Sequence, residues 1–262
     1  MKVIPIIHVG LGNVGTEVFR LVQAQRANIQ KQYGIDLRYV AVFNSKGGYF
    51  KKSGITDVPD TINSSLDVLN ALKKIKSPYI LIDTTASEET VPVLTHTLQS
   101  NSYVVISNKK PLSSSQQLFD ALFKISNNHV LFETTVGAGL PVIQTLQTLL
   151  DSGDEIVSIE GCFSGTLGFI CSAMEKGISY SNAVGQAKEK GFTEPDPRDD
   201  LSGLDVARKA LILGRMIGLK LELKDIARNS FFPKELSSVS VEDFMRSIQN
   251  FDSQYETQFK KS

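Results

Sequence analysis

Apolar residues in the first half of the chain fall into short runs that alternate with stretches of helical periodicity. Short apolar runs bounded by polar turns are typical of strands that are buried on both faces of a parallel sheet. The runs lie at residues 3–9, 37–43, 79–83, 104–107 and 130–134. Helical patterns lie between them at residues 18–29, 65–74 and 114–125. This alternation predicts an α/β fold built on a doubly wound parallel sheet.

The pattern changes after the glycine-rich turn at residues 137–141. Helical patterns then lie at residues 142–150, 167–176 and 181–190 and in a stretch that ends at Gly218. Residues 155–163 have the pattern of a further strand, and we expect Cys162 to be packed inside it. We therefore predict two domains, with the parallel sheet in residues 1–140 and an α+β domain in residues 141–262.

A glycine-rich turn follows the first predicted strand and has the sequence Gly10-Leu11-Gly12-Asn13-Val14-Gly15. A strand, G-x-G-x-x-G and a helix in this order form the Rossmann dinucleotide-binding fingerprint. The first glycine permits a tight turn, the second lets the backbone approach the pyrophosphate, and the third permits close helix–strand packing. Free N–H groups at the helix start can bind phosphates. We predict that this turn binds NAD or NADP; the alternative is a tight turn with a structural role alone.

The residues after the second predicted strand bear on the choice between NAD and NADP. An NAD-specific site usually has an acidic residue here, which bonds the ribose 2′-hydroxyl. This chain has Asn44-Ser45-Lys46 instead, and a lysine would not repel a 2′-phosphate. The sequence therefore favours NADP or the use of both cofactors, although an ordinary polar turn has the same composition.

Three polar residues, Thr85, Lys109 and Glu133, lie at or just past the ends of predicted strands. Ligands of doubly wound sheets bind beyond the carboxyl ends of the strands. Their shared placement makes these residues candidates for the cofactor site. Taken singly, each is typical of an ordinary surface residue.

Composition narrows the classes of partner. The chain of 262 residues has 28 basic and 28 acidic residues, so its charge does not indicate a nucleic acid. No apolar run approaches the ~18 residues of a membrane-spanning helix, and the apolar N-terminus leads into a glycine turn instead of a cleavage site. Its two cysteines and three histidines lack zinc-site spacing. We expect a protein of the reducing cytosol that acts on a small molecule.

The most polar stretch, Gly191–Lys209, contains five acidic residues, three basic residues and two prolines. The prolines exclude a helix from its first half, whereas its second half has a helical pattern. Asp205 and Lys209 stand four residues apart, on one face of that helix. A dense polar loop that leads into a helix with such a pair is typical of a small-molecule active site. The alternative is an exposed ion pair worth a few tenths of a kcal/mol.

These motifs resemble those of homoserine dehydrogenase over nearly the whole chain. The matching segments are GLGNVG, NKKP, ETTVGAGLP, EGCFSGTLGFI and GFTEPDPRDDLSGLDVARK. The resemblance implies a two-domain enzyme that reduces L-aspartate 4-semialdehyde to L-homoserine with NADPH or NADH. This reaction belongs to the biosynthesis of threonine, methionine and isoleucine.

The resemblance also implies roles for single residues. It implies nucleotide contacts at Asn13, Val14, Thr85, Lys109 and Gly191. It implies substrate contacts at Glu194 and Asp205, with Lys209 as the proton donor to the aldehyde oxygen. The residue types fit this chemistry, because hydride addition to an aldehyde leaves alkoxide character that an ammonium group stabilises and protonates.

The segment ETTVGAGL resembles the family's monovalent-cation loop. It implies sodium bound through Glu133, Val136, Ala138 and Leu140, mostly by backbone carbonyls that a glycine-rich turn can direct at a cation. A homodimer is implied as well. The chain stops at Ser262, whereas members of the family usually continue for several tens of residues, so we expect either a compact variant or a truncated substrate domain. The alternative function is a catalytically impaired nucleotide-binding or partner-binding protein of the same fold.

Overall fold

The computed structural model describes residues 1–126 and 129–259. The chain divides into two compact units, Met1–Asp151 and Ser152–Ser262. Helix α6 (Val142–Asp151) belongs to the first unit. The division therefore lies at the end of this helix, whereas the sequence pattern placed it near residue 140.

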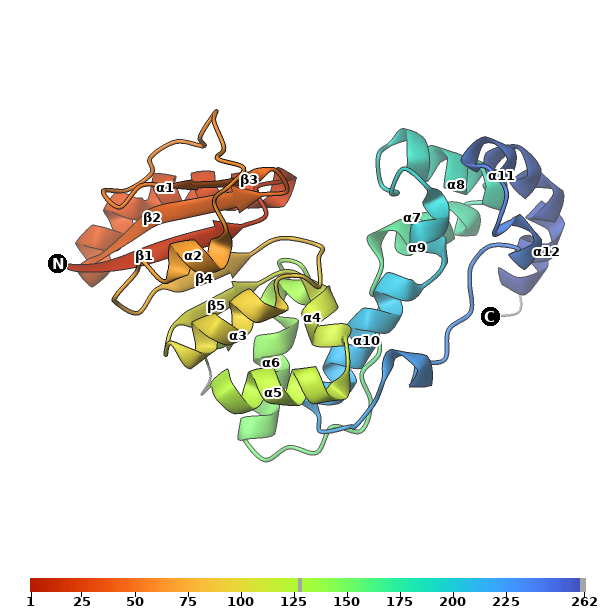
Figure 1. Ribbon diagram of the computed structural model, residues 1–262. Coiled ribbons are helices and arrows are strands. Elements are labelled where there is room, and N and C mark those ends of the chain that lie inside the picture. Colours follow the sequence, from red (N-terminus) through yellow and green to blue (C-terminus); the bar gives the residue numbers. More distant parts are fainter. Residues whose placement is uncertain (127–128, 260–262) are drawn as a thin grey trace. The chain divides into compact units, whose positions relative to one another are not determined.

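The first unit contains a six-stranded sheet with the order β3-β2-β1-β4-β5-β6 (Figure 1). Its parallel strands are β1 (Lys2–Val9), β2 (Ile35–Asn44), β4 (Ile80–Asp83), β5 (Tyr103–Ile106) and β6 (Val130–Leu131). The doubly wound parallel sheet predicted from the sequence is confirmed. An additional edge strand, β3 (Gly47–Phe50), runs antiparallel to β2 and was not predicted.

Helices cover both faces of this sheet. Figure 1 shows α1 (Asn13–Tyr33) on one face and α2 (Val68–Leu72) and α3 (Val91–Gln99) on the other. The unit also contains α4 (Lys109–Ser113), α5 (Gln116–Ser126) and the 3₁₀ turn η1 (Glu133–Thr135). Strand residues such as Ile7, Val42 and Leu81 are fully buried, because each strand is covered on both sides. Burial of each such side chain contributes about 1.5–3 kcal/mol.

A buried ion cluster fixes the amino end of β2. The carboxylate of Asp36, fully buried, accepts hydrogen bonds at 2.6 Å from Arg26 and from Arg38 and at 2.8 Å from Gln30. These bonds, with the largest effect from Arg26, hold the pKa of Asp36 well below its usual range. The cluster joins the last turns of α1 to the amino end of β2, whereas the glycine-rich turn lies at the carboxyl ends of the strands.

The second unit is helical. Its helices are α7 (Gly165–Glu175), α8 (Tyr180–Glu189), α9 (Pro197–Leu201), α10 (Leu204–Met216), α11 (Val241–Ser247) and α12 (Asp252–Phe259). Short 3₁₀ turns lie between α10 and α12, at η2 (Leu223–Asp225), η3 (Lys234–Leu236) and η4 (Ile248–Phe251). The core of the unit centres on Tyr180, whose ring stacks on Tyr255 at 4.1 Å and whose hydroxyl donates to the carbonyl of Phe231.

The strand predicted over residues 155–163 is not formed, and no strand occurs among the described residues of the second unit. The segment is exposed: Val157 has 95% of its surface accessible, and Cys162, predicted to be a packing residue, is exposed as well. A strand needs a partner strand, and no segment of this unit within residues 152–259 pairs with it. The sequence pattern indicated a strand, but it could not show that no partner strand lies within residues 152–259. None of the helices within the described ranges is long and apolar enough to cross a membrane.

Candidate functional site

The three glycines of the turn after β1 have three different environments. Gly10 has φ +101°, and a Cβ there would lie 2.8 Å from the backbone of Thr84 and Thr85. A Cβ on Gly15 would overlap with the carbonyl oxygen of Gly10. A Cβ on Gly12 would meet nothing within 4 Å, and Gly12 is the N-cap of α1. The turn is therefore closed tightly by its outer glycines and is open at the middle one, where a pyrophosphate can approach the helix start.

A buried histidine braces this turn. The hydroxyl of Thr84 donates to the Gly10 carbonyl at 2.7 Å, and Nε2 of His8 lies 2.9 Å from the same hydroxyl. Because the single hydroxyl hydrogen is used for Gly10, the histidine is the donor and its proton is on Nε2. Nδ1 is buried and has no partner among the described residues. Burial accordingly lowers the pKa of His8 from its ordinary 6.5 to about 4.

We predict that this histidine makes the fold sensitive to mild acid. The unfolded chain protonates His8 below pH 6.5, whereas the folded protein keeps it neutral until about pH 4. The free energy of unfolding should therefore fall by about 3 kcal/mol as the pH decreases across this interval. Denaturant titrations at several pH values measure the change.

The matched variant for this measurement is His8→Gln, which keeps a donor for Thr84 but does not titrate. Its unfolding free energy should lose the pH dependence between pH 6.5 and 4. The cluster at Asp36 acts in a different window, because its depressed pKa removes stability only as the pH falls below about 4. Equal pH dependence in both proteins would contradict the assignment to His8.

Two of the predicted nucleotide contacts lie at the carboxyl ends of adjacent strands. Thr85 follows β4, and its N–H and hydroxyl both donate to Oδ1 of Asp83, at 2.9 and 2.7 Å. Lys109 is the first residue of α4, just after β5, and Asn108 caps that helix by accepting the Lys110 N–H at 3.1 Å. The structure thus places the glycine-rich turn, Thr85 and Lys109 along one edge of the sheet, as predicted. We call it the nucleotide edge.

Sequence reasoning missed Asp83 and Asn108. Both are buried and both hold predicted site residues in place. A signal for Asp83 existed, because it is a lone charged residue at the end of the apolar run YILID. Asn108 stands before Lys109-Lys110-Pro111, a position that suits an N-cap.

The polar turn at Asn44-Ser45-Lys46 joins β2 to β3 as a tight hairpin. Oδ1 of Asn44 accepts the N–H of Lys46 at 2.8 Å, so this side chain shapes the turn. Lys46 is exposed beyond the carboxyl end of β2. This segment is therefore an ordinary polar turn in structure, and its Lys46 side chain is at the same time exposed and accessible to a ligand.

The four residues of the predicted cation loop lie on one turn between β6 and α6. The carboxylate of Glu133 accepts the N–H groups of Ile143 and Gln144, at 2.8 and 2.9 Å, and so caps α6. Val136 is buried, and Ala138 has φ +52°. The carbonyl of Leu140 accepts the Val142 N–H at 2.9 Å. Binding of sodium by this turn stays a prediction.

In the second unit, Lys209 is held by two groups. Its Nζ lies 2.8 Å from Oδ2 of Asp205, one helical turn earlier, and donates to the carbonyl of Phe163 at 2.6 Å. The Lys209 side chain is 15% exposed and that of Asp205 is 45% exposed. Lys209 is therefore not half of an exposed surface pair: its side chain is largely buried, and its ammonium is fixed in direction by a carboxylate and a carbonyl.

The loop with Glu194 is held by a residue of α9. Oδ2 of Asp200 accepts the N–H of Glu194 at 2.8 Å, and Oδ1 accepts the hydroxyl of Thr166 at 3.1 Å. Glu194 is exposed. Gly191 ends α8 with φ +70°, a conformation that favours glycine. The chain thus leaves α8 at Gly191, presents Glu194 to solvent, and returns to α9.

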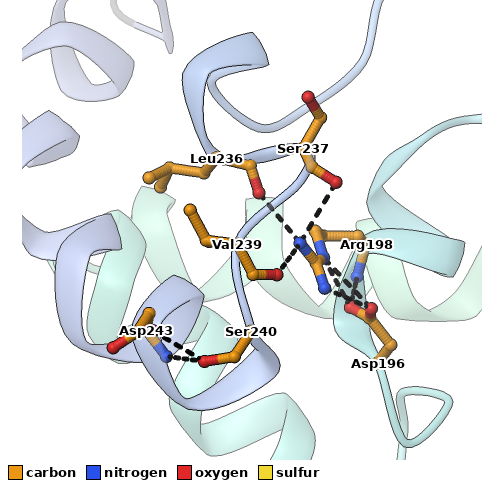
Figure 2. Close-up of polar contacts among 7 residues, drawn as sticks. All are labelled: Asp196, Arg198, Leu236, Ser237, Val239, Ser240 and Asp243. Carbon is orange, nitrogen blue, oxygen red and sulfur yellow. Dashed lines mark hydrogen bonds and ion pairs between the residues drawn. The ribbon is translucent and has the colours of Figure 1, made fainter.

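Helix α9 is in turn tied to the C-terminal part of the unit by Arg198 (Figure 2). The guanidinium forms a forked pair with Asp196, at 2.9 and 2.6 Å. It also donates to the carbonyls of Leu236 and Val239, at 2.9 and 2.8 Å, and to that of Ser237 at 3.3 Å. The hydrogen bond from Arg198 lowers the pKa of Asp196. Sequence reasoning assigned no role to Arg198 or Asp200.

Replacing Arg198 with glutamine should destabilise the second unit by about 3 kcal/mol, because the partly buried carboxylate of Asp196 and the three carbonyls lose the guanidinium donor together. The matched control is Arg246→Gln, since Arg246 pairs with Asp243 at 3.6 Å and is 76% exposed. That change should cost below about 1 kcal/mol. Denaturant unfolding measures both, and equal effects of the two variants would contradict the role given to Arg198.

Comparison with known proteins covers both units. A family model described as "Homoserine dehydrogenase, NAD binding domain" matches residues 10–133, and a model described as "Homoserine dehydrogenase" matches residues 141–261. The homoserine dehydrogenase of Schizosaccharomyces pombe is similar at 36% identity, with 94% of this chain and 71% of the relative covered.

A bifunctional aspartokinase/homoserine dehydrogenase of Haemophilus influenzae is 38% identical over 98% of this chain. The chain spans about a third of the length of that relative, 33%. Among solved structures, a Candida auris protein of unknown function matches with a TM-score of 0.86 at 28% identity, covering 100% of this chain and 76% of the other.

Proposed function

This chain belongs to the homoserine dehydrogenase family, and from this premise we propose that it reduces L-aspartate 4-semialdehyde to L-homoserine with NADPH or NADH. The observation that carries the proposal is the Lys209 ammonium, which stands on a largely buried side chain and is directed by Asp205 and by the Phe163 carbonyl. A proton donor for an aldehyde oxygen needs this kind of fixed, charged N–H group.

The residues of the second unit would act on the substrate as follows. When bound, the nicotinamide supplies a hydride to the aldehyde carbon. The aldehyde oxygen gains negative charge, and Nζ of Lys209 stabilises that charge and then donates a proton to it. Asp205 holds the ammonium while the proton moves. The exposed carboxylate of Glu194 would accept hydrogen bonds from the α-amino group of the substrate.

The nucleotide edge supports the cofactor part of the proposal. The open space at Gly12 and the N–H groups of Asn13 and Val14 suit a pyrophosphate, and Thr85 and Lys109 lie at the neighbouring strand ends. Gly191 would add a backbone contact. The hairpin after β2 has no acidic residue, and its exposed Lys46 favours NADPH over NADH.

We also propose that the protein forms a homodimer through residues 155–163. This segment exposes Val157 and Ile159 and has no strand partner within the described residues, so a second copy can pair with it isologously. Val157→Lys should shift the protein to monomer, as measured by light scattering at several concentrations. Leu219→Lys, at another exposed apolar site of the same unit, should leave the mass unchanged. A monomeric wild type would contradict this proposal.

Incubation with L-aspartate 4-semialdehyde and NADPH tests the proposed function, with homoserine identified by mass spectrometry. We expect homoserine in proportion to the NADPH consumed, and a higher rate with low NADPH than with low NADH. Saturable NADPH binding without product, in a folded sample, would instead indicate the catalytically impaired nucleotide-binding protein considered above.

A further inference from the structure

At the carboxyl end of β4, the first unit contains a charged group that the proposed reaction does not use. The side chain of Asp83 is 0% exposed, and within the described residues its carboxylate contacts hydrogen-bond donors but no basic group. A buried carboxylate without a counter-ion is costly unless donors satisfy its oxygens. The groups that satisfy Asp83 are therefore strongly constrained in position.

Those donors come from Thr85, itself a predicted nucleotide contact, and from Asn108, the residue before Lys109. Oδ1 of Asp83 accepts both the N–H and the hydroxyl of Thr85, which fixes the backbone and the side chain of this residue together. Oδ2 accepts a hydrogen bond at 3.1 Å from Nδ2 of Asn108, which lies in the loop after β5. One carboxylate thus joins the loops after two adjacent strands.

Asn108 is 2% exposed and serves both loops. Besides Asp83, its Nδ2 contacts the carbonyl of Ser87 at 2.6 Å and the hydroxyl of Thr85 at 3.0 Å. Its Oδ1 accepts the Lys110 N–H and begins α4, the helix whose first residue is Lys109. Nδ2 is surrounded by oxygens and Oδ1 faces an N–H, so the amide is held in this orientation, with its two N–H hydrogens toward those oxygens.

The loop after β4 also packs on the glycine-rich turn. The two backbones are so close that a Cβ on Gly10 would lie 2.8 Å from the N atom of Thr85. The position of Thr85 therefore sets the surface on which that turn rests. Asp83 and Asn108 connect all three segments of the nucleotide edge without being exposed themselves.

We propose that Asp83 and Asn108 are positioning residues of the nucleotide site, which fix Thr85 and Lys109 for the cofactor through the carboxylate–amide bond between them. The inference rests on the proposed function in that it takes NADPH as the ligand of this edge. Asp83 and Asn108 would raise the affinity for NADPH and would take no part in proton transfer.

The test is the Kd for NADPH, measured by fluorescence titration, which does not depend on turnover. Asn108→Asp places a second carboxylate against Asp83, and Asp83→Asn turns an amide donor toward that of Asn108. Each should raise the Kd at least tenfold. The double variant Asp83→Asn/Asn108→Asp restores one donor–acceptor pair and should bind NADPH better than the product of the single effects predicts.

Two further variants separate positioning from general stability. Asn108→Ser keeps a helix N-cap but removes the donor to Asp83, so it should fold and still raise the Kd if Asn108→Asp does not fold. Asp36→Asn alters a second fully buried carboxylate of this sheet, at the amino end of β2. It should lower the unfolding free energy and leave the Kd of the folded protein unchanged.

A wild-type Kd in folded Asp83→Asn and Asn108→Ser would overturn the inference, as would a double variant that shows no coupling. A wild type that binds NADPH but forms no homoserine would defeat the proposed function alone, because the Kd measurements still decide the role of the pair. A wild type that does not bind NADPH would overturn both.

Discussion

Replacing Lys209 with methionine should lower kcat for the reduction of aspartate semialdehyde by about 10²–10⁴-fold, the usual contribution of a general acid. Methionine fills a similar volume but supplies neither charge nor proton to the developing alkoxide. The glycine-rich turn belongs to the first unit, whereas Lys209 belongs to the second. The Kd for NADPH should therefore stay near its wild-type value. Steady-state kinetics and a fluorescence titration check the two halves of this prediction.

The matched control is Lys176→Met, because Lys176 is exposed at the end of α7 in the same unit. It should change kcat by less than about twofold, as expected for the substitution of an exposed surface residue. If Lys209→Met kept a rate within a few-fold of wild type, its pairing with Asp205 and the Phe163 carbonyl would be structural only, and the proton donor would have to be another group.

The second large effect concerns Gly12, where alanine should remove most NADPH binding without harming the fold. A Cβ at Gly12 meets no protein atom within 4 Å, and its backbone angles, φ −85° and ψ −159°, suit alanine. The new methyl group would occupy the space in which the pyrophosphate approaches the backbone. We expect the Kd for NADPH to rise at least tenfold, about 1.4 kcal/mol, with an unchanged melting temperature.

Two other glycines provide the contrast. Gly15→Ala should weaken both binding and stability, because its Cβ would overlap with the Gly10 carbonyl oxygen. Gly185→Ala, inside α8 and also in open space, should stabilise that helix by up to about 1 kcal/mol and leave NADPH binding unchanged. If Gly12→Ala bound NADPH like the wild type, the open space at this glycine would not be the pyrophosphate site.

The sequence predicted those features of the fold that depend on local pattern. Apolar runs such as residues 79–83 predicted strands that are buried and parallel in the structure. The glycine spacing of the turn predicted different roles for Gly10, Gly12 and Gly15, and the three residues do have different surroundings. The interval between Asp205 and Lys209 predicted their ion pair, because a helix brings residues four apart together. Each inference needed only the chain within one or two elements.

Features that depend on distant partners could not be predicted in this way. The run at residues 155–163 has a strand pattern, but a strand forms only beside another strand. Strand β3 was missed because Gly47 and Gly48 lower its strand propensity, although it pairs with β2. The contact of Lys209 with the Phe163 carbonyl and that of Asp83 with Asn108 join residues far apart in sequence, so neither spacing nor composition reports them.

The most direct test of the proposed reaction is to follow the hydride itself. Wild-type protein would be incubated with L-aspartate 4-semialdehyde and NADPH that carries deuterium at the transferable position of the nicotinamide. We expect homoserine with one deuterium on its hydroxyl-bearing carbon, in amounts that fall in Lys209→Met in step with kcat. Unlabelled homoserine, or NADPH binding with no homoserine at all, would contradict the proposal that this chain transfers hydride to the aldehyde.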